Sequence, residues 1–278
     1  MIFASEVPVI SALNPYRKIE EVFLNVWSRT HPSQVVDLRE QLSLPSTSPE
    51  EKLHAVVQEL GAAEAIQDLV HEASKAETID QVAQAQAKVV HSLPPTTPAK
   101  IKAEVVDLVT ATMYKGFGVK HETNCIEQYA ARRQLVVKDQ NLVFSKKKVA
   151  TIATSTLFVG GKIDGRTDQK VIEVKNRVKR FLTPLPKYDI AQLQTYLYIL
   201  GVEEGELVEQ LCTTMTQTKM TKVSWDETMW KRDIEPYLIR FGAALIKLME
   251  DKRAQSAFLL AEGEQQREIL RYLWSQDV

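Results

Sequence analysis

Residues 160–196 have the sequence GGKIDGRTDQKVIEVKNRVKRFLTPLPKYDIAQLQTY, which predicts a strand, a tight turn, a second strand, a basic loop and a helix. The first strand is expected over residues 156–163 and ends at Asp164. Gly165 follows it and can adopt the backbone angles that a turn requires. The second strand is expected over residues 170–176. The segment therefore predicts a β-hairpin with an aspartate at its turn.

Side chains of the second strand alternate between two faces, so Glu173 and Lys175 share one face while Ile172 and Val174 share the other. Asp164 stands across the hairpin, within reach of both polar side chains. Two carboxylates beside a lysine suit a hard divalent cation, since Mg²⁺ prefers oxygen ligands and keeps several waters. The lysine can then hold or polarise a metal-bound water. This arrangement is typical of phosphodiester cleavage.

The Glu-x-Lys pattern also has a simpler interpretation, a solvated sheet face with a cross-strand ion pair. The helix after the hairpin favours a site, because Asp189, Gln192 and Tyr196 share one of its faces. Leucines can occupy the neighbouring apolar stripe of this helix. A glutamine and a tyrosine directed toward the carboxylates strengthen the prediction.

Four segments, in order along the chain, resemble motifs of the PD-(D/E)XK nuclease superfamily, and within it the lambda exonuclease and YqaJ-type viral recombinase nucleases. Residues 2–7 (IFASEV) resemble its TASEV segment, and residues 118–122 (GVKHE) resemble its GKQYE helix motif. Residues 163–165 (IDG) with 173–175 (EVK) resemble its PDG…ELK core. Residues 188–194 (YDIAQLQ) resemble its QVQ helix.

The resemblance implies an α/β, restriction-endonuclease-like fold, with a central mixed sheet flanked by helices. It also implies a metal-dependent DNA exonuclease that acts 5′ to 3′ on linear duplex in recombination, repair or viral DNA processing. The Mg²⁺ ligands would be Asp164, Glu173, the main-chain carbonyl of Val174, and Glu122 directly or through water. Mn²⁺ is expected to substitute for Mg²⁺.

The resemblance assigns further roles around this centre. Lys175 would position the attacking water, Gln192 would orient that water or a ligand, and Tyr196 would support them. Ser5 would hold a terminal 5′ phosphate, although it serves equally well as a helix N-cap. The family's arginine before this segment has no counterpart in the sequence, and Arg17 is the nearest cation that could replace it. The residues expected to contact DNA or its phosphates are Ser5, Arg17, Lys162, Arg166, Arg177, Lys179 and Arg180.

Composition sets the outer bounds. The 278 residues, 44% of them apolar and 26% charged, fit one large domain over residues 1–278 with a helical insertion at 42–112. Residues 162–187 hold eight basic and three acidic side chains, a balance that suits a polyanion approaching a metal. Two cysteines and five scattered histidines argue against a disulfide framework and against zinc. Without a signal peptide or a membrane span, a cytoplasmic or nuclear location is expected, rather than secretion.

The remaining segments are predicted from their apolar patterns. In the insertion, a helix capped by Ser48 begins at Pro49, another covers 79–93, and a third begins near 97. A separate helix over 111–133 would present Glu122 on an inward-facing stripe, either to a metal or in a surface salt bridge. Short strands are expected at 135–137, 142–144, 149–154, 206–215 and 219–225. We expect a long helix that is capped by Asp226 and extends to about residue 252, and a last helix over 262–274. The expected core or seam residues of this part are Trp225, Trp230 and Trp274.

Three other functions fit parts of this pattern. The first is an endonuclease of the same fold, because the core motif does not encode a preference for DNA ends. The second is a catalytically inactive, nuclease-like DNA-binding module. The third is a structural or assembly protein whose helical insertion is the functional part. A single-strand annealing or recombination partner and a homotrimer are implied by the resemblance alone, and no membrane contact is expected.

Overall fold

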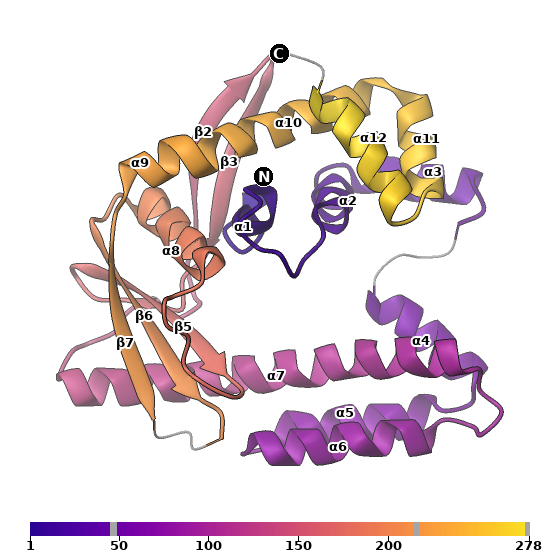
Figure 1. Cartoon of the computed structure of the whole chain (residues 1–278), viewed down its shortest axis with the longest axis horizontal. Helices are drawn as coiled ribbons and strands as arrows, with labels where there is room; N and C mark the ends of the chain where they lie inside the picture. The colour runs from indigo at the N-terminus through magenta and orange to yellow at the C-terminus, as the bar shows by residue number, and fades with distance from the viewer. Residues whose placement is uncertain (45–48, 214–216, 276–278) are drawn as a thin grey trace.

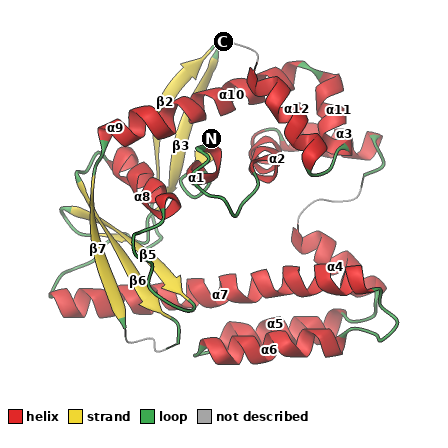
Figure 2. Ribbon diagram, viewed as in Figure 1, coloured by secondary structure: helices red, strands yellow, loops and turns green. Residues whose placement is uncertain are grey.

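The computed structural model of the chain, which describes residues 1–44, 49–213 and 217–275, has an α/β fold built on two small mixed sheets (Figure 1; Figure 2). The first has the strand order β1 (Ile2–Phe3), β3 (Ser155–Lys162), β2 (Phe144–Ile152). The second has the order β4 (Gly165–Arg166), β5 (Lys170–Arg177), β6 (Glu204–Leu211), β7 (Thr218–Ser224). The pairs β1–β3 and β5–β6 are parallel and the others antiparallel. The expected α/β class with mixed sheets is confirmed, with the single central sheet divided in two.

Helices surround both sheets. Those before the first long strand are α1 (Val7–Ile10), α2 (Ile19–Thr30), α3 (Pro32–Gln41), α4 (Pro49–Glu59), α5 (Ala63–Lys75), α6 (Ile79–Ser92) and α7 (Ala99–Arg133). Those after the hairpin are α8 (Lys187–Leu200), α9 (Glu227–Met229), the π-helical turn η1 (Trp230–Ile234), α10 (Glu235–Glu250), α11 (Lys252–Leu260) and α12 (Glu264–Ser275). Helix α8 lies between the four-stranded sheet and α1 (Figure 1).

The hairpin at the centre of the chain differs from the one expected, because the first predicted strand, β3, belongs to the other sheet and β5 pairs with the two-residue strand β4. Gly165 begins strand β4, where it pairs with Ile172. A Cβ atom at Gly165 would come within 2.5 Å of the Val137 side chain, a separation that real contacts do not show. Glycine is therefore required here because Val137 packs against the backbone.

The strands before the hairpin also differ from the prediction. A single nine-residue strand, β2, replaces the two short strands expected at 142–144 and 149–154. It pairs with β3 along its length, with a register shift between Lys148 and Ala150. Residues 135–137 form no strand, and the chain there meets the sheet through the Val137 side chain and through a bridge between Lys138 and Arg166. Strands β6 and β7 are present close to their expected positions, and residues 214 and 215, the end of the first expected strand, lie outside the described residues.

Helix α7 is one continuous helix of 35 residues, where the pattern predicted two. Gly116 and Gly118 lie within it, and glycine in a helix interior is tolerated at a modest cost. Its N-terminal half packs with α4, α5 and α6 around a separate apolar core. Residue 112, the expected end of the insertion, lies in the middle of this helix. Helix α4 begins at Pro49 as expected, whereas the turn over 45–48, with its cap Ser48, lies outside the described residues.

The C-terminal helices cover the first sheet and α2. Asp226 accepts a hydrogen bond from the Met229 amide at 2.9 Å, as expected for a cap, and α9, η1 and α10 continue to Glu250. Helix α11 was not predicted, and the Asp251 side chain caps it. Trp230 is fully buried and stacks on Tyr198, which confirms its place in the core. Trp225 and Trp274 pack at the edge of the same core.

Strand β5 is covered on both faces, which positions the candidate site. Val171 belongs to the main core with α8, whereas Ile172 and Val174 pack against Ile126 and Tyr129 of α7. The expected alternation of the strand is confirmed. Glu173 and Lys175 therefore lie on the α8 side of the sheet.

A buried carboxylate joins α7 to this sheet. Glu206, on β6, accepts a hydrogen bond from the Tyr129 hydroxyl at 2.6 Å and another from Arg133 at 3.0 Å. Its side chain is only 7% exposed, so the carboxylate depends on these two donors.

We expect Tyr129→Phe to destabilise the fold by about 1–3 kcal/mol, the cost of leaving a buried acceptor without one of its donors. For a chain of this size each kcal/mol lowers the melting temperature by about 2–4 °C. Thermal denaturation followed by circular dichroism measures the change. Tyr16→Phe is the matched control, because the Tyr16 ring is 79% exposed. Equal melting temperatures for the two variants would show that the Glu206 contact does not stabilise the protein.

Candidate active site

Glu173, Lys175 and Gln192 form a closed hydrogen-bonded group where β5 meets α8. The Lys175 Nζ atom lies 2.7 Å from Glu173 Oε1 and 3.1 Å from Gln192 Oε1. Gln192 Nε2 donates to the same Glu173 Oε1 at 2.7 Å. The predicted contact between the EVK segment and the helix is therefore present.

The second oxygen of Glu173 is the unusual atom of this group. The Glu173 side chain is 2% exposed, and its Oε2 atom has no hydrogen-bond partner within the described parts of the chain. Buried carboxylate oxygens are almost always satisfied by a donor or a cation. The unpaired Oε2 therefore fits a ligand atom for a positive charge.

Asp164 lies across the hairpin, as expected. Its Oδ2 atom accepts a hydrogen bond from the Val174 amide at 2.7 Å. Strand β4 pairs with β5 at Val171 and Ile172. Farther along β5, the Val174 amide donates to the Asp164 side chain and not to a backbone carbonyl of β4. Because the N–H and C=O groups of one strand residue point to the same side, the Val174 carbonyl also points to the β4 side of the strand.

Glu122 approaches the same region from α7. It accepts a hydrogen bond from Asn141 Nδ2 at 3.3 Å. Burial raises the pKa of Glu122, and the negative charge of Glu173 raises it further. Burial likewise raises the pKa of Asp164 well above its ordinary value, with additional contributions from Glu173 and Glu122. The three carboxylates are therefore close enough to repel one another.

The three carboxylates that repel one another do not already form a complete set of metal ligands. Within residues 1–44, 49–213 and 217–275, no three His, Cys, Asp or Glu side chains are grouped closely enough to hold a metal ion. Glu173 is instead turned toward Lys175 and Gln192. The negative charges of the three carboxylates therefore lie in one region, while Glu173 is bound by Lys175.

Lys175 is protonated in this arrangement. Burial lowers the pKa of Lys175, but the charge and hydrogen bond of Glu173, together with Asp189 and Asp164, outweigh that effect and raise it. A lysine with a raised pKa does not act as a base near neutral pH. Its chemistry here is that of a fixed positive charge.

Tyr196 orders the end of β3 immediately before Asp164. Its hydroxyl donates to the Lys162 carbonyl at 2.8 Å, and its side chain is almost fully buried. The ring lies so close to Gly161 that an added Cβ atom would approach it within 3.0 Å. Tyr196 is thus a positioning residue for the strand that leads to the carboxylates.

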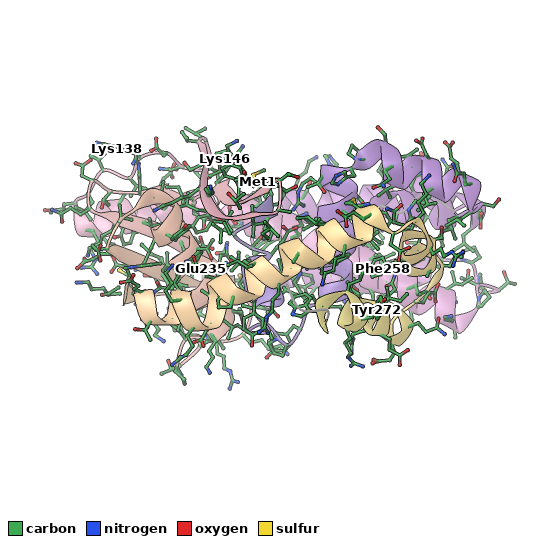
Figure 3. The ribbon with its side chains drawn as sticks, turned by 90° about the horizontal axis from the view of Figure 1, so that it is seen from above. Met1, Lys138, Lys146, Glu235, Phe258 and Tyr272 are labelled. Atoms are coloured by element: carbon green, nitrogen blue, oxygen red, sulfur yellow. The ribbon has the colours of Figure 1, made fainter. Side chains whose placement is uncertain are left out.

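The cations predicted to contact DNA fall into two groups. Lys162, Arg166, Lys179 and Arg180 are exposed, and Arg166 pairs with Asp139. The Lys138 and Lys146 side chains lie at the same edge of the molecule as Met1 (Figure 3). Lys138 there pairs with Asp168.

Arg177 differs from the other predicted cations because the fold already uses its charge. Its guanidinium lies 2.6 Å from Asp189 and 2.8 Å from Glu209, and its side chain is 12% exposed. Glu209 also accepts the Leu182 amide at 3.1 Å, so this network holds the basic loop after β5 against β6. The geometry gives Arg177 a structural role and no support for a contact with DNA.

Ser5 and Arg17 lie together, although not in the way expected. Ser5 is exposed and caps no helix, because α1 begins after Glu6 and has only four residues. Its main-chain carbonyl accepts a hydrogen bond from Arg17 Nη1 at 3.2 Å. The predicted cap is therefore wrong, and the structure places Arg17 beside the Ser5 backbone.

Asn141 is a site residue that the sequence analysis missed. Its backbone has a left-handed φ of 52°, its amide donates to the Ile163 carbonyl at 3.0 Å, and its side chain reaches Glu122. It thereby ties the loop before β2 to both sides of the carboxylate group. The run Asp139-Gln140-Asn141 was the available signal, because Asp and Asn favour turns of this kind.

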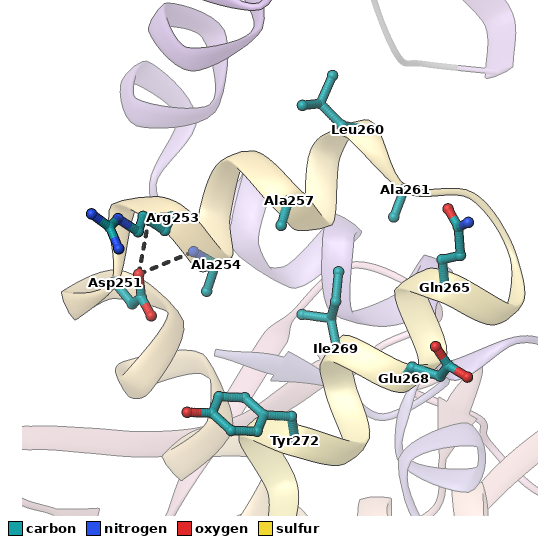
Figure 4. A pocket seen from close by; sticks show the side chains of 10 residues that line it. All are labelled: Asp251, Arg253, Ala254, Ala257, Leu260, Ala261, Gln265, Glu268, Ile269 and Tyr272. Atoms are coloured by element: carbon teal, nitrogen blue, oxygen red, sulfur yellow. Dashed lines mark hydrogen bonds between the residues drawn. The ribbon is translucent and has the colours of Figure 1, made fainter.

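A second concave region lies far along the chain. A surface pocket of about 680 Å³ between α11 and α12 is lined largely by small and apolar side chains, among them Ala257, Leu260 and Ile269 (Figure 4). Its charged residues include Asp251, which is occupied in capping α11. The pocket brings together no group resembling the one around Glu173.

No helix in the described chain has the length and apolar character needed to cross a membrane.

Comparison with protein-family models gives no match, and comparison with curated proteins gives none either. Among solved structures, "Crystal structure of SSO0001" is 16% identical with a TM-score of 0.39, covering 60% of this chain and 79% of that one. An alkaline exonuclease, LHK-Exo from Laribacter hongkongensis, is 17% identical with a TM-score of 0.40, covering 69% and 93%. The same exonuclease in complex with dAMP is 18% identical with a TM-score of 0.39, covering 73% and 100%.

We expect Asp164→Asn to raise the melting temperature of the metal-free protein at neutral pH. The raised pKa means that folding opposes ionisation of Asp164, so its contribution to stability falls as the pH rises from its ordinary pKa through the raised one. Asparagine removes the charge and keeps an acceptor for the Val174 amide. Each kcal/mol of relieved repulsion is worth about 2–4 °C in a thermal scan.

Asp168→Asn is the control, because Asp168 is exposed on the same hairpin and pairs with Lys138. Repeating the scans with added Mg²⁺ should stabilise the wild-type protein and leave Asp164→Asn unchanged. A lower melting temperature for metal-free Asp164→Asn than for Asp168→Asn would contradict the inferred repulsion.

Proposed function

We propose that this protein is a metal-dependent nuclease that hydrolyses DNA phosphodiester bonds. The observation that carries the proposal is the unpaired, buried Oε2 atom of Glu173, next to a second carboxylate and a lysine–glutamine pair. A protein that only binds DNA gains nothing from carboxylates that repel phosphate.

The residues proposed to hold the metal are Asp164, Glu173 and the Val174 carbonyl, with Glu122 directly or through water. All of them offer oxygen, which Mg²⁺ and Mn²⁺ prefer. The raised pKa values of Asp164 and Glu122 fit the same group, because a cation would relieve their repulsion. A bound divalent ion would activate water and stabilise negative charge developing on the phosphate.

The remaining groups act on the substrate and on the water. Protonated Lys175 supplies a positive charge within 2.7 Å of Glu173, where it can offset charge on a phosphate oxygen. Gln192 carries both a donor and an acceptor, so it can hold a water in one orientation while it contacts Glu173. Exposed Lys179 and Arg180, next to this strand, are proposed to hold the DNA backbone.

We expect the purified protein to cleave end-labelled DNA with Mg²⁺ or Mn²⁺ and to be inactive in EDTA. Glu173→Gln should abolish cleavage while DNA binding persists or tightens, because one repulsive charge is lost. Lys175→Ala should lower the rate by about a hundredfold, the usual effect of removing one positioned catalytic group. Wild-type turnover in excess EDTA, or full activity of Glu173→Gln, would end the metal-nuclease proposal.

Within nucleases, we favour an exonuclease that recognises a 5′ phosphate near Ser5 and Arg17. The exposed Arg17 guanidinium lies 3.2 Å from the Ser5 carbonyl, so an anion near the Ser5 hydroxyl would meet a cation.

Linear duplex with a 5′ phosphate should therefore be degraded faster than the same duplex with a 5′ hydroxyl. Arg17→Ala and Ser5→Ala should reduce this preference without changing the dependence on metal. Lys18→Ala is the matched control, since Lys18 is an adjacent exposed cation that pairs with Glu21. Closed circles cut as fast as linear DNA would indicate the endonuclease instead.

A further inference from the structure

Helix α8 presents three polar or aromatic side chains toward the candidate site at intervals of four residues. They are Tyr188, Gln192 and Tyr196, which fall on one face of the helix. Gln192 binds Glu173, and Tyr196 binds the end of β3. Tyr188 therefore lies one helical turn from the carboxylate group, yet neither the hydrogen-bonded group around Glu173 nor the proposed chemistry uses it.

A second tyrosine meets Tyr188 from another part of the chain. The Tyr16 ring contacts the Tyr188 ring edge to face, with centroids 5.9 Å apart and an angle of 83° between the planes. Tyr16 belongs to the segment between α1 and α2, where Asn14 Oδ1 accepts its backbone amide at 2.9 Å. The turn that holds the ring in place is therefore built locally.

The Tyr16 ring remains 79% exposed, the largest exposure among the exposed large apolar and aromatic side chains that the structure describes. Burial in the core does not explain its position, because the ring is exposed and meets Tyr188 only at an edge-to-face contact. A tyrosine ring exposes a flat face of the size of a nucleobase, and such faces bind bases by stacking. The exposed ring of Tyr16 is therefore suited to stacking, and its partner Tyr188 lies on the helix that carries Gln192.

The charge next to Tyr16 favours a polyanion. Arg17 follows Tyr16 and is exposed, with its guanidinium on a backbone carbonyl and not on a carboxylate of the described chain. Around Tyr188 the charges are mixed, because Asp189 acts on its hydroxyl together with Arg177 and Lys175. An exposed aromatic ring beside a cation is typical of surfaces that bind single-stranded nucleic acid.

We infer that the exposed ring of Tyr16, supported by Tyr188, stacks on an unpaired nucleobase of the DNA strand that enters the site. This inference rests on the proposed function and specifies how the site holds its substrate, because a base in a single strand is free to lie flat on an aromatic ring.

The test is equilibrium binding, in EDTA, of a fluorescently labelled single-stranded oligonucleotide that carries one abasic position moved along its length. On the wild-type protein one position should be sensitive, where loss of the base weakens binding by about 5- to 100-fold, the usual effect of removing one stacked base. Tyr16→Ala should bind the intact oligonucleotide more weakly by a similar factor and lose the sensitivity at that position. Tyr16→Phe keeps the ring and should retain both properties.

Tyr272→Ala is the matched control, because Tyr272 is 59% exposed on α12, at the other end of the molecule from Lys138 (Figure 3). The inference is overturned if the abasic sensitivity persists in Tyr16→Ala, or if no position is sensitive in the wild-type protein. It is also overturned if Tyr272→Ala weakens binding as much as Tyr16→Ala does. The binding assay needs no cleavage, so it separates the two proposals. A protein that shows the abasic sensitivity but does not cleave DNA would refute only the nuclease. A protein that cleaves DNA without the abasic sensitivity would refute only the stacking.

Discussion

The structure around β5 depends on accommodating one carboxylate in the interior. Glu173 is buried, and the ammonium group of Lys175 and the amide of Gln192 compensate only one of its two oxygens. Removing a carboxylate from water is expensive unless its lone pairs are satisfied, so the neighbouring elements must supply donors at fixed positions. The placement of α8 against β5 meets that requirement by bringing Gln192 to Glu173, and Tyr196 on the same helix binds the end of β3.

The local order of the hairpin was predictable because period-two alternation is a property of the backbone. It correctly separated Glu173 and Lys175 from Ile172 and Val174, and it placed Asp164 beside them. The helix after the hairpin was predictable for a related reason, since residues four apart share a helical face. In both cases the contacts depend on residues close together in the sequence.

Contacts between distant segments were not predictable. The sheet is divided in two because β3 and β4, which follow each other along the chain, belong to different sheets. No pattern within either strand encodes that change. Arg177 looked like its exposed neighbours Lys179 and Arg180, and only Asp189 and Glu209 distinguish it. The extra helix α11 was missed because the prediction extended the preceding helix past Asp251, which instead begins a new one.

The continuity of α7 determines how the helical region relates to the rest of the molecule. Met113 packs in the core formed with α4, α5 and α6, and Glu122 approaches the carboxylates from the same helix. The distance between that core and Glu122 is set by backbone hydrogen bonds, at about 1.5 Å per residue, and not by a flexible linker. The region is therefore an extension of the wall of the site and not a module tethered to it. A deletion ending at residue 112 would cut α7 in mid-helix and leave Glu122 on its shortened remainder.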